Sequence, residues 1–422
     1  MKRKVTISLS LSVFLIFSLM ASACAGLVGF EEEPVTGDFG PAYTPQEHQA
    51  RTFEALWTNL QDNYIYFESA DVEWDSIRDR YLERINSGLT NDEFTDLLNE
   101  LESDLPGGSL TYQSRAERIE TDIGDLSSYE GIGAFVGFSE DPQPHVVLLG
   151  VIEGSPAEQA GLKAHDSIFE IDGSPVLLEE GLSVVDRIRG PSGTSVTLNV
   201  QTPGSPERSV EVKRAKLTST GKLEAYEIAD TNYAYMLFPP AAYAEMMDDV
   251  LLNLQTFTTN KTLEGLILDL RVAGSSRAWP FEELFTMFYD GPIGEFYNRE
   301  NKQLLQVQGQ DEFASQSIPL VILVGQNTQG FPEILAGSLQ MHKRATIVGA
   351  TTPGLVETTS SYYLPDGSRI FVETTSFVLP NGDEIGTSGV RPDVQVEASW
   401  DEILPESDPV LETAIETLRS QE

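Results

Sequence analysis

The sequence predicts a multi-domain α+β protein in which a small helical domain precedes a compact module of short strands and helices. Three observations support this fold class. The chain has 422 residues, which is enough for two or three domains. Hydrophobic residues make up 40% of it, so the domains can bury real cores. The hydrophobic period is helical up to about residue 105 and changes to short β-rich runs around Gly131.

The composition argues against nucleic acid as a partner. Lys and Arg number 27 and Asp and Glu number 66, which gives a formal net charge of −39. A field of this sign repels phosphate backbones and anionic lipid headgroups. Any attachment to a membrane would therefore depend on lipid chains rather than on charge.

The first 23 residues have the features of an export signal. Basic residues at positions 2–4 precede an apolar run over 5–20, which is short for a membrane span, and small residues follow at 21–23. Cys24 is the only cysteine, so no disulfide can form within the chain. Its position resembles the site at which bacterial lipoproteins are cleaved and acylated. We therefore expect residues 1–23 to be a lipoprotein signal peptide and the protein to be extracytoplasmic and lipid-anchored to the bacterial cell membrane. The alternative is an ordinary signal peptide beside an incidental cysteine.

A tether and a helical domain are expected next. Residues 24–45 lack a helical or strand period and contain several Pro, Gly and Glu, as a tether does. Apolar residues then recur at helical spacing in three stretches, the third of which begins where Thr90 and Glu93 are placed to cap each other's amides. We expect these helices to form a domain over residues 46–125. The predicted core residues are Phe53, Leu56, Trp57, Leu60, Tyr64, Trp74, Ile77, Tyr81, Ile85, Phe94, Leu97, Leu98 and Leu101.

The module that follows mixes short helices and strands. Residues 155–158 read Ser-Pro-Ala-Glu, which supplies an N-cap, a first-turn proline and a reciprocal acid, and Gly161 stops the helix after little more than one turn. Strands are expected over 167–171 and 195–200. A second helical pattern carries Leu182, Val185 and Ile188.

These residues carry a resemblance to a known family. The run at 154–162, with Ile171-Asp172-Gly173 behind it, resembles the PDZ domains of bacterial envelope proteases. With the helices before it, the buried strand pattern at 265–271 and the strand-and-turn runs at 364–367, 379–382 and 389–393, the chain resembles the tail-specific, or C-terminal processing, serine proteases over roughly residues 50–400. The resemblance implies a PDZ domain over 126–216, an α/β protease-like core over 217–404 and a C-terminal helix over 405–422.

The resemblance also implies a binding site for polypeptide C-termini. The PDZ module of this family captures the carboxyl end of a protein, because amides in a glycine-rich turn hold a carboxylate and a sheet edge pairs with an extended peptide. The corresponding peptide-binding residues are Gly131, Ile132, Gly133, Ala134, Phe135, Val185 and Ile188. The alternative is that the glycines only shape a hairpin and the apolar residues belong to the core.

The positions of the family's catalytic residues hold no reactive side chain. The nucleophilic serine of the family lies in a turn between a buried strand, here 320–324, and a helix opened by an acid, here Glu333; counting back places it on Gly330. The family's general-base lysine corresponds to Leu355. The loop over 272–276 stands where the family has asparagines and paired glycines that shape the oxyanion site. We therefore expect no catalytic residues, and a proteolytically inactive relative that binds polypeptide ends at the cell envelope.

Two other functions are compatible with the sequence. The first is an active serine endopeptidase with relocated groups, in which Ser275, Ser276 or Thr328 is the nucleophile and Lys343 the base. The second is an adaptor lipoprotein in which the PDZ module holds a partner protein. No cofactor or metal is expected, because Asp366-Gly367 and Gly382-Asp383 read as turns between strands rather than as a calcium loop.

Overall fold

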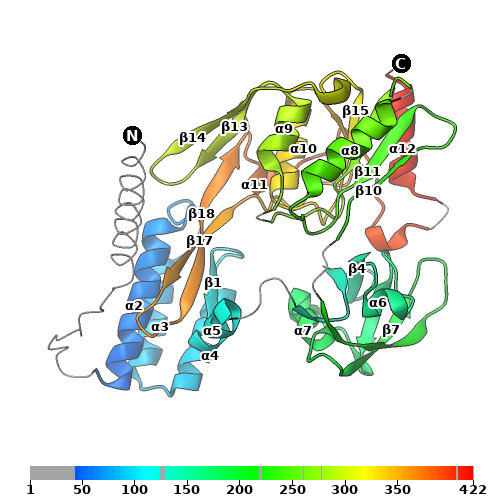
Figure 1. Cartoon of the computed structure of the whole chain (residues 1–422). Helices are drawn as coiled ribbons and strands as arrows, with labels where there is room; N and C mark the ends of the chain where they lie inside the picture. The colour runs from blue at the N-terminus through cyan, green and yellow to red at the C-terminus, as the bar shows by residue number, and fades with distance from the viewer. Residues whose placement is uncertain are drawn as a thin grey trace, which may run out of the picture. The chain divides into compact units, whose positions relative to one another are not determined.

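The computed structural model describes residues 43–123, 129–217, 221–259, 261–276, 278–404 and 407–421 (Figure 1). The expected signal peptide, Cys24 and most of the expected tether lie outside these residues. The described residues from Gln49 onward belong to one compact unit. Within the described ranges, no helix is long and apolar enough to cross a membrane.

Three helices open the described chain, as their hydrophobic period predicts. They are α2 (Pro45–Asn63), α3 (Trp74–Asn86) and α4 (Asn91–Asp104). The expected capping box at the start of α4 is present, because the Thr90 hydroxyl accepts the Glu93 amide and the Glu93 carboxylate accepts the Thr90 amide. Eleven of the thirteen expected core residues are buried, whereas Trp74 and Ile77 are partly buried against the same cluster.

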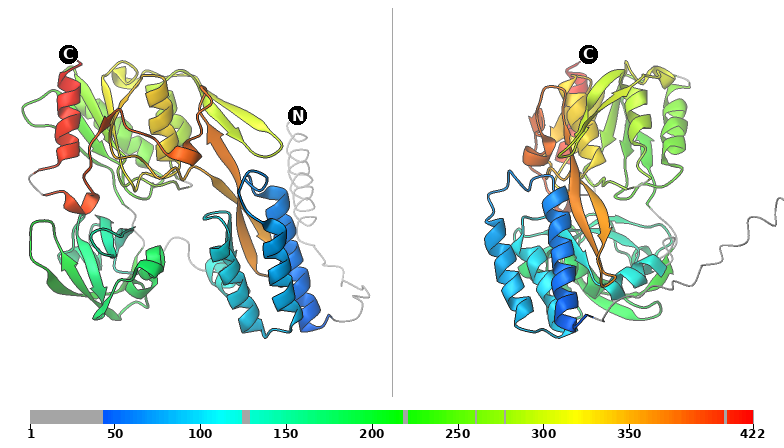
Figure 2. Two further views of the ribbon diagram at one scale, coloured as in Figure 1. Left: turned by 180° about the vertical axis from the view of Figure 1, so that it is seen from behind. Right: turned by 90° about the vertical axis from the view of Figure 1, so that its left-hand side faces the viewer.

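This helical core is completed by strands that are distant in sequence. Strand β1 (Leu110–Gln113), which is followed by α5 (Arg115–Ile123), pairs with β18 (Arg369–Val378), and β18 pairs in turn with β17 (Thr358–Tyr363). Leu364, Ile370 and Val372 are buried in the same cluster as Phe53 and Leu56. The long hairpin of β17 and β18 beside α2–α4 is visible in Figure 2. Since the hairpin lies about 250 residues downstream, helical periodicity alone gave no sign of it.

One carboxyl group of this hairpin links stability to pH. Burial, and the nearby Glu357 carboxylate, raise the pKa of Glu373 to about 7. The folded state therefore disfavours ionised Glu373. The protonated carboxyl group contributes fully to stability below about pH 4.5, and this contribution is lost as the pH rises through about 7. We expect Glu373→Gln to stabilise the protein by about 1–2 kcal/mol at pH 8 and to have little effect at pH 5.

Urea unfolding of the purified protein at the two pH values measures this difference. Glu300→Gln, which alters an exposed carboxylate, serves as the matched control and should change stability at neither pH. An equal effect of Glu373→Gln at both pH values would contradict the raised pKa.

The module after residue 129 contains an antiparallel sheet in the order β3-β4-β5-β7-β8. Its strands and helices are β2 (Tyr129–Gly131), β3 (Ala134–Ser139), β4 (His145–Val151), α6 (Pro156–Gln159), β5 (Ser167–Ile171), β6 (Ser174–Pro175), η1 (Leu178–Val184), α7 (Val185–Ile188), β7 (Ser195–Gln201), β8 (Arg208–Lys213) and β9 (Ala215–Leu217). The Ser155 hydroxyl caps α6 by accepting the Glu158 amide, as expected. Because β3 lies at the end of this order, one edge of β3 is free of the sheet's other strands.

The helix predicted from Leu182, Val185 and Ile188 is not continuous in the structure. The structure has a 3-10 helix, η1, followed by the four-residue α7 in place of one continuous helix. Gly181 adopts φ 49° and ψ −138° inside η1, which breaks the helix there. Leu182 is consequently 58% exposed, whereas Ile188 is buried.

The core is a six-stranded sheet in the order β10-β11-β12-β15-β16-β19, parallel from β11 onward. Its elements are β10 (Glu224–Glu227), β11 (Tyr233–Leu237), α8 (Met246–Thr258), β12 (Gly265–Asp269), α9 (Phe281–Phe288), β15 (Leu320–Val324), α10 (Phe331–Met341), β16 (Thr346–Gly349), β19 (Val394–Gln395) and α12 (Pro409–Arg419). All residues of β12 and β15 are buried, as their uninterrupted apolar runs predict. Alternate residues of these strands pack against α8–α10 on one face and against α12 on the other (Figure 1).

The remaining elements connect these parts. They are β13 (Gly291–Tyr297), β14 (Lys302–Val307), η2 (Glu312–Ala314), α11 (Ile385–Ser388) and η3 (Trp400–Glu402). Strand β13 pairs with β14 on one side and with β18 on the other.

Candidate functional site

The seven residues expected to bind a peptide lie together around one groove. The groove has a volume of about 390 Å³ and is enclosed by the loop before β3, by β3 itself and by α7. Its lining comprises Gly131, Ile132, Gly133, Ala134, Phe135, Val185 and Ile188, together with Val136, Leu182, Asp186 and Arg189. We call it the PDZ groove. Its place beside the free edge of β3 leaves room for an extended chain to pair with that strand.

The loop at one end of the PDZ groove is held in a fixed conformation. The carbonyl oxygens of Ile132 and Gly133 accept the amides of Ala157 and Ile152, at 2.8 and 3.0 Å. Gly133 has φ 84°, and a side chain there would overlap the Ser155 Cβ. The C=O and N–H groups of a trans peptide point in opposite directions, so the amides of Gly133 and Ala134 point away from these contacts. This arrangement suits the capture of a carboxylate.

A second region, between β15 and α10, contains the position that corresponds to the family's nucleophile. Gly330 is the N-cap of α10 and has φ 73°. The hydroxyl oxygen of Ser275 accepts the amide of Phe331 at 2.6 Å. A Cβ built on Gly330 would overlap the Ser275 oxygen and would lie 2.8 Å from its Cβ. Ser275 therefore fills the space that a side chain at position 330 would need.

Glu333 binds the two loops of this region together. Its fully buried carboxylate accepts the amides of Gly330, Gly354 and Leu355 at 2.9, 2.6 and 2.8 Å, and the hydroxyl of Thr352 at 2.5 Å. Burial raises the pKa of this carboxyl group, although all four hydrogen bonds act in the opposite direction. Glu333 thus has a structural role at the start of α10 in addition to its charge near the helix N-terminus.

Neither of the two positions considered for a general base, 355 and 343, brings a basic side chain to the start of α10. The Leu355 side chain is 52% exposed, and its backbone is fixed by Glu333. Lys343 lies just beyond the C-terminal end of α10, whereas Gly330 caps its N-terminal end; at 1.5 Å per residue these ends are roughly 16 Å apart. Lys343 is therefore too far away to take a proton from a hydroxyl near Gly330.

Three histidines are engaged in contacts of their own. His145 contacts the Asp401 carboxylate at 2.7 Å, His165 contacts the Trp400 carbonyl at 2.6 Å, and His342 contacts the Tyr289 hydroxyl at 2.8 Å. None of these partners belongs to the loop over 272–276 or to the turn before α10.

The hydroxyl groups of the alternative nucleophiles have different surroundings. Thr328 is buried; it donates to the Leu270 carbonyl at 2.8 Å and accepts the Gly325 amide at 2.9 Å. These two bonds close the turn after β15. The Ser276 hydroxyl is buried without a hydrogen-bond partner among the described residues. No lysine or histidine is hydrogen-bonded to Ser275, Ser276 or Thr328 within the described ranges.

Two backbone amides of the loop over 272–276 are already hydrogen-bonded to carbonyl groups. The Ala273 amide donates to Leu270, the Gly274 amide donates to the Pro240 carbonyl, and the Ala273 carbonyl accepts the Gln329 amide at 3.0 Å. Two amides that would otherwise be able to stabilise an oxyanion are therefore occupied.

Within the described ranges, no cluster of three or more His, Cys, Asp or Glu side chains is arranged to hold a metal ion.

Two structural roles in this region were not predicted from the sequence. Ser275 is 55 residues from Gly330 in the sequence, and only the fold brings its side chain against the start of α10. Arg271 bridges the buried Asp269 and the helix-capping Asp408, at 2.5 and 2.7 Å. A signal for the second role existed, since an arginine directly after a buried strand needs an acidic partner.

The chain is similar to known proteins along most of its length. The model of peptidase family S41 matches residues 232–396, a PDZ domain model matches 147–202, and the model of the tricorn protease C1 domain matches 45–102. A carboxyl-terminal-processing protease of Synechocystis sp. is 29% identical over 86% of this chain and 85% of its own length. A chloroplastic C-terminal processing peptidase of Tetradesmus obliquus is 28% identical over 86% of this chain and 80% of its own length.

A solved structure shares the fold. The photosystem II D1 C-terminal processing protease superposes with a TM-score of 0.64 at 22% identity, over 88% of this chain and 97% of that protein. The matches extend from α2 through the PDZ module to β19. The chain thus combines a tricorn protease C1 domain, a PDZ domain and a peptidase family S41 core, as C-terminal processing proteases similar to it along most of their length do.

Proposed function

We propose that this protein binds the C-termini of extracytoplasmic polypeptides through the PDZ groove and does not cleave them. The observation that supports inactivity most strongly is the packing at Gly330. The position has no nucleophile, and Ser275 occupies the space where one would stand. Leu355 at the lysine position supplies no base. In serine proteases the loss of nucleophile or base lowers turnover on the order of a million-fold.

The PDZ groove supports the binding half of the proposal. A peptide that adds to the free edge of β3 would place its carboxyl end at the loop of Gly131, Ile132 and Gly133, and its last apolar side chain against Val185 and Ile188. A carboxylate that accepts backbone amides forms charge-assisted hydrogen bonds, which are worth about 1.5–3 kcal/mol each.

Peptide binding can be tested with a pair of ligands that differ only at the last group. We expect a peptide with a free carboxyl end and an apolar last residue to bind at least about tenfold more tightly than its carboxamide. Leu182→Asp should weaken binding of the free peptide, because Leu182 lines the PDZ groove. Leu178→Asp is the matched control, since Leu178 is similarly exposed, at 53%, but is not part of the groove lining.

Fluorescence anisotropy of labelled peptides gives the four affinities. Equal binding of the free and amidated peptides, or equal effects of the two substitutions, would argue against capture of a C-terminus in this groove. Failure of these tests would leave the question of proteolytic activity open, because that rests on Gly330 and Ser275.

We also propose that the protein is extracytoplasmic and anchored to the bacterial cell membrane by acylation of Cys24. This proposal rests on the order of basic, apolar and small residues before that cysteine. Mass spectrometry of the mature protein from the membrane fraction should show an acylated N-terminal cysteine. An unmodified Cys24 thiol in the mature protein would refute the lipid anchor.

An active peptidase is the second candidate, and two observations favour it. Ser275 lies at the N-terminus of α10, where helix amides lower the energy of an oxyanion, and the Ser276 hydroxyl has no partner among the described residues. Among the described residues no base is hydrogen-bonded to either hydroxyl, and a serine without a base is a poor nucleophile. The inactive function is therefore better supported.

A further inference from the structure

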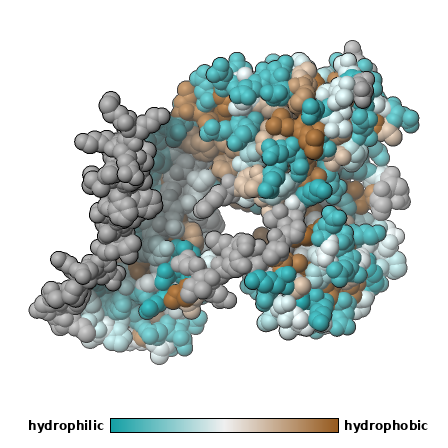
Figure 3. All heavy atoms as spheres, in the orientation of Figure 1, coloured by the Kyte–Doolittle hydropathy of each residue, from teal (hydrophilic) through white to brown (hydrophobic). Residues whose placement is uncertain are grey.

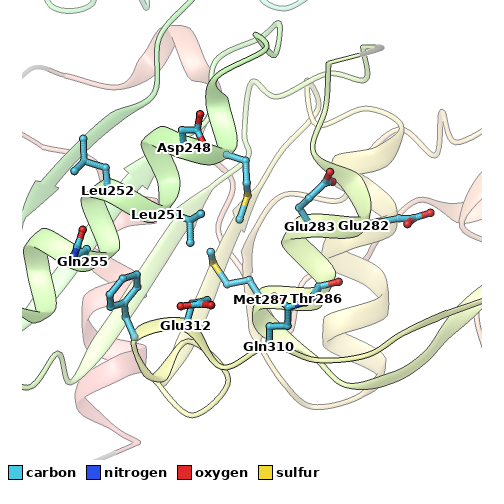
Figure 4. Close-up of a pocket in the computed structure, with 12 residues that line it drawn as sticks. Asp248, Leu251, Leu252, Gln255, Glu282, Glu283, Thr286, Met287, Gln310 and Glu312 are labelled. Atoms are coloured by element: carbon cyan, nitrogen blue, oxygen red, sulfur yellow. The ribbon is translucent and has the colours of Figure 1, made fainter. Parts of the chain in front are cut away.

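A groove between α8 and α9 shares no lining residue with the PDZ groove or with the region around Gly330. Its volume is about 660 Å³ (Figure 4). We call it the α8–α9 groove. Its apolar lining comes from Met247, Leu251 and Leu252 on α8, Met287 on α9 and Phe313 in η2. Figure 4 shows Leu251 and Met287 facing each other between the two helices.

Four of the five apolar side chains of this groove are accessible from outside, whereas Met287 is only 2% exposed. Leu252 is 60% exposed, and Met247, Leu251 and Phe313 are only partly buried. Figure 3 shows hydrophobic residues gathered over α8 and α9 among hydrophilic ones. Exposed apolar surface of this kind is typical of a binding site. Two methionines, Met247 and Met287, make the lining adaptable, because the thioether side chain is flexible and polarizable.

The rim of the α8–α9 groove is acidic. Asp248, Glu282, Glu283 and Glu312 line it, and all four residues are exposed. No lysine or arginine lines the groove, and no ion pair involves these carboxylates among the described residues. Glu282 and Glu283 also suit the first turn of α9, where a negative charge opposes the helix dipole. The rim as a whole therefore favours a ligand that carries positive charge.

One wall of the groove is held in an unusual backbone conformation. Phe313 and Ala314 have φ values of 59° and 63°, in the left-handed region that residues with a side chain rarely adopt. Two bonds hold this segment against α9: the Ser315 hydroxyl donates to the Met287 carbonyl and the Gln310 amide donates to the Thr286 carbonyl, both at 2.7 Å. Phe313 is thus presented to the groove by a strained segment, a kind of feature that clusters at functional sites.

We propose that the α8–α9 groove docks an amphipathic helix of a partner protein, with Lys or Arg residues flanking two or three large apolar residues. The apolar residues would enter between Leu251 and Met287, and the basic residues would pair with the acidic rim. This combination of an apolar, methionine-containing groove and acidic edges suits recognition of a basic amphipathic helix. A second copy of the chain is a poor occupant, because each copy carries a formal charge of −39.

A designed pair of peptides tests this occupant. The first is a helical peptide of about 18 residues with Leu on one face and Lys on the other, and the second has Glu in place of Lys. We expect the Lys peptide to bind at least about tenfold more tightly than the Glu peptide. Because the protein is acidic overall, the location of binding has to be established with variants.

Two substitutions in the groove are matched with two outside it. Leu252→Glu and Glu283→Lys should each weaken binding of the Lys peptide by about tenfold or more. Leu304→Glu, at a leucine that is 57% exposed on β14, and Glu300→Lys, at an exposed carboxylate, should leave it unchanged within about twofold. All four positions are exposed, so the folded state should survive each change, and circular dichroism checks this.

Three results would overturn the proposal. One is equal binding of the two peptides, and another is equal weakening by the groove variants and their controls, which would indicate a general attraction to the acidic surface. The third is binding of a nonionic detergent in the groove without any binding of the Lys peptide, which would assign the groove to an uncharged amphiphile.

Discussion

Gly330→Ser should lower the free energy of unfolding by about 2–4 kcal/mol and should create no reactive serine. Gly330 has φ 73°, which is unfavourable for a residue with a side chain. The new Cβ would also overlap the Ser275 hydroxyl, so the packing at the start of α10 would have to shift. Urea denaturation gives the stability change.

A double-mutant cycle separates the overlap from the backbone strain. Ser275→Gly should recover at least about 1 kcal/mol in the Gly330→Ser background, because it removes the overlapping atoms. Gly382→Ser is the strain control: Gly382 has φ 91°, and a Cβ there meets nothing within 4 Å. If Gly330→Ser and Gly382→Ser cost the same, Ser275 does not fill the position of the family's nucleophile.

Glu333→Ala should destabilise the protein by about 3–5 kcal/mol. The substitution would leave the amides of Gly330, Gly354 and Leu355 and the Thr352 hydroxyl without their acceptor in a buried region. Glu333→Gln should be nearly as harmful, since each carboxylate oxygen accepts two hydrogen bonds and an amide group would present donors to two of these partners.

The matched control for this result is Glu283→Ala. Glu283 occupies the first turn of α9 as Glu333 does that of α10, but it is exposed. Its loss should cost about 0.3–1 kcal/mol, the usual contribution of an acid near a helix N-terminus. Similar costs for the two alanine variants would show that Glu333 acts only through its charge and not as an acceptor that joins the two loops.

Local sequence signals predicted many of the elements, since their causes lie within a few residues. The strands Ser167–Ile171 and Leu320–Val324 occur with the expected bounds, and the caps at Thr90 and Ser155 form as expected. These elements follow from alternating or continuous apolar runs and from side chains that bond nearby amides.

Long-range packing explains what the sequence did not predict. The β17–β18 hairpin buries Ile370 with the helices of the first domain, although the two segments are far apart in the chain. The Thr328 hydroxyl donates to the Leu270 carbonyl across 58 residues, a contact that no local pattern indicates. The sequence shows that position 330 is not a serine. That Ser275 occupies the space beside Gly330 depends on how two loops of the core meet.

The central claim is that the core contains no hydroxyl activated for attack on a peptide bond. It is tested most directly by incubating the purified protein with a fluorophosphonate probe, beside an active C-terminal processing protease, and mapping modified residues by mass spectrometry. We expect no labelled serine, and cleavage of an unstructured polypeptide slower than that of the active enzyme on the order of a million-fold. Covalent labelling of Ser275 or Ser276, with matching hydrolysis that is lost on substitution of the labelled serine, would contradict this account.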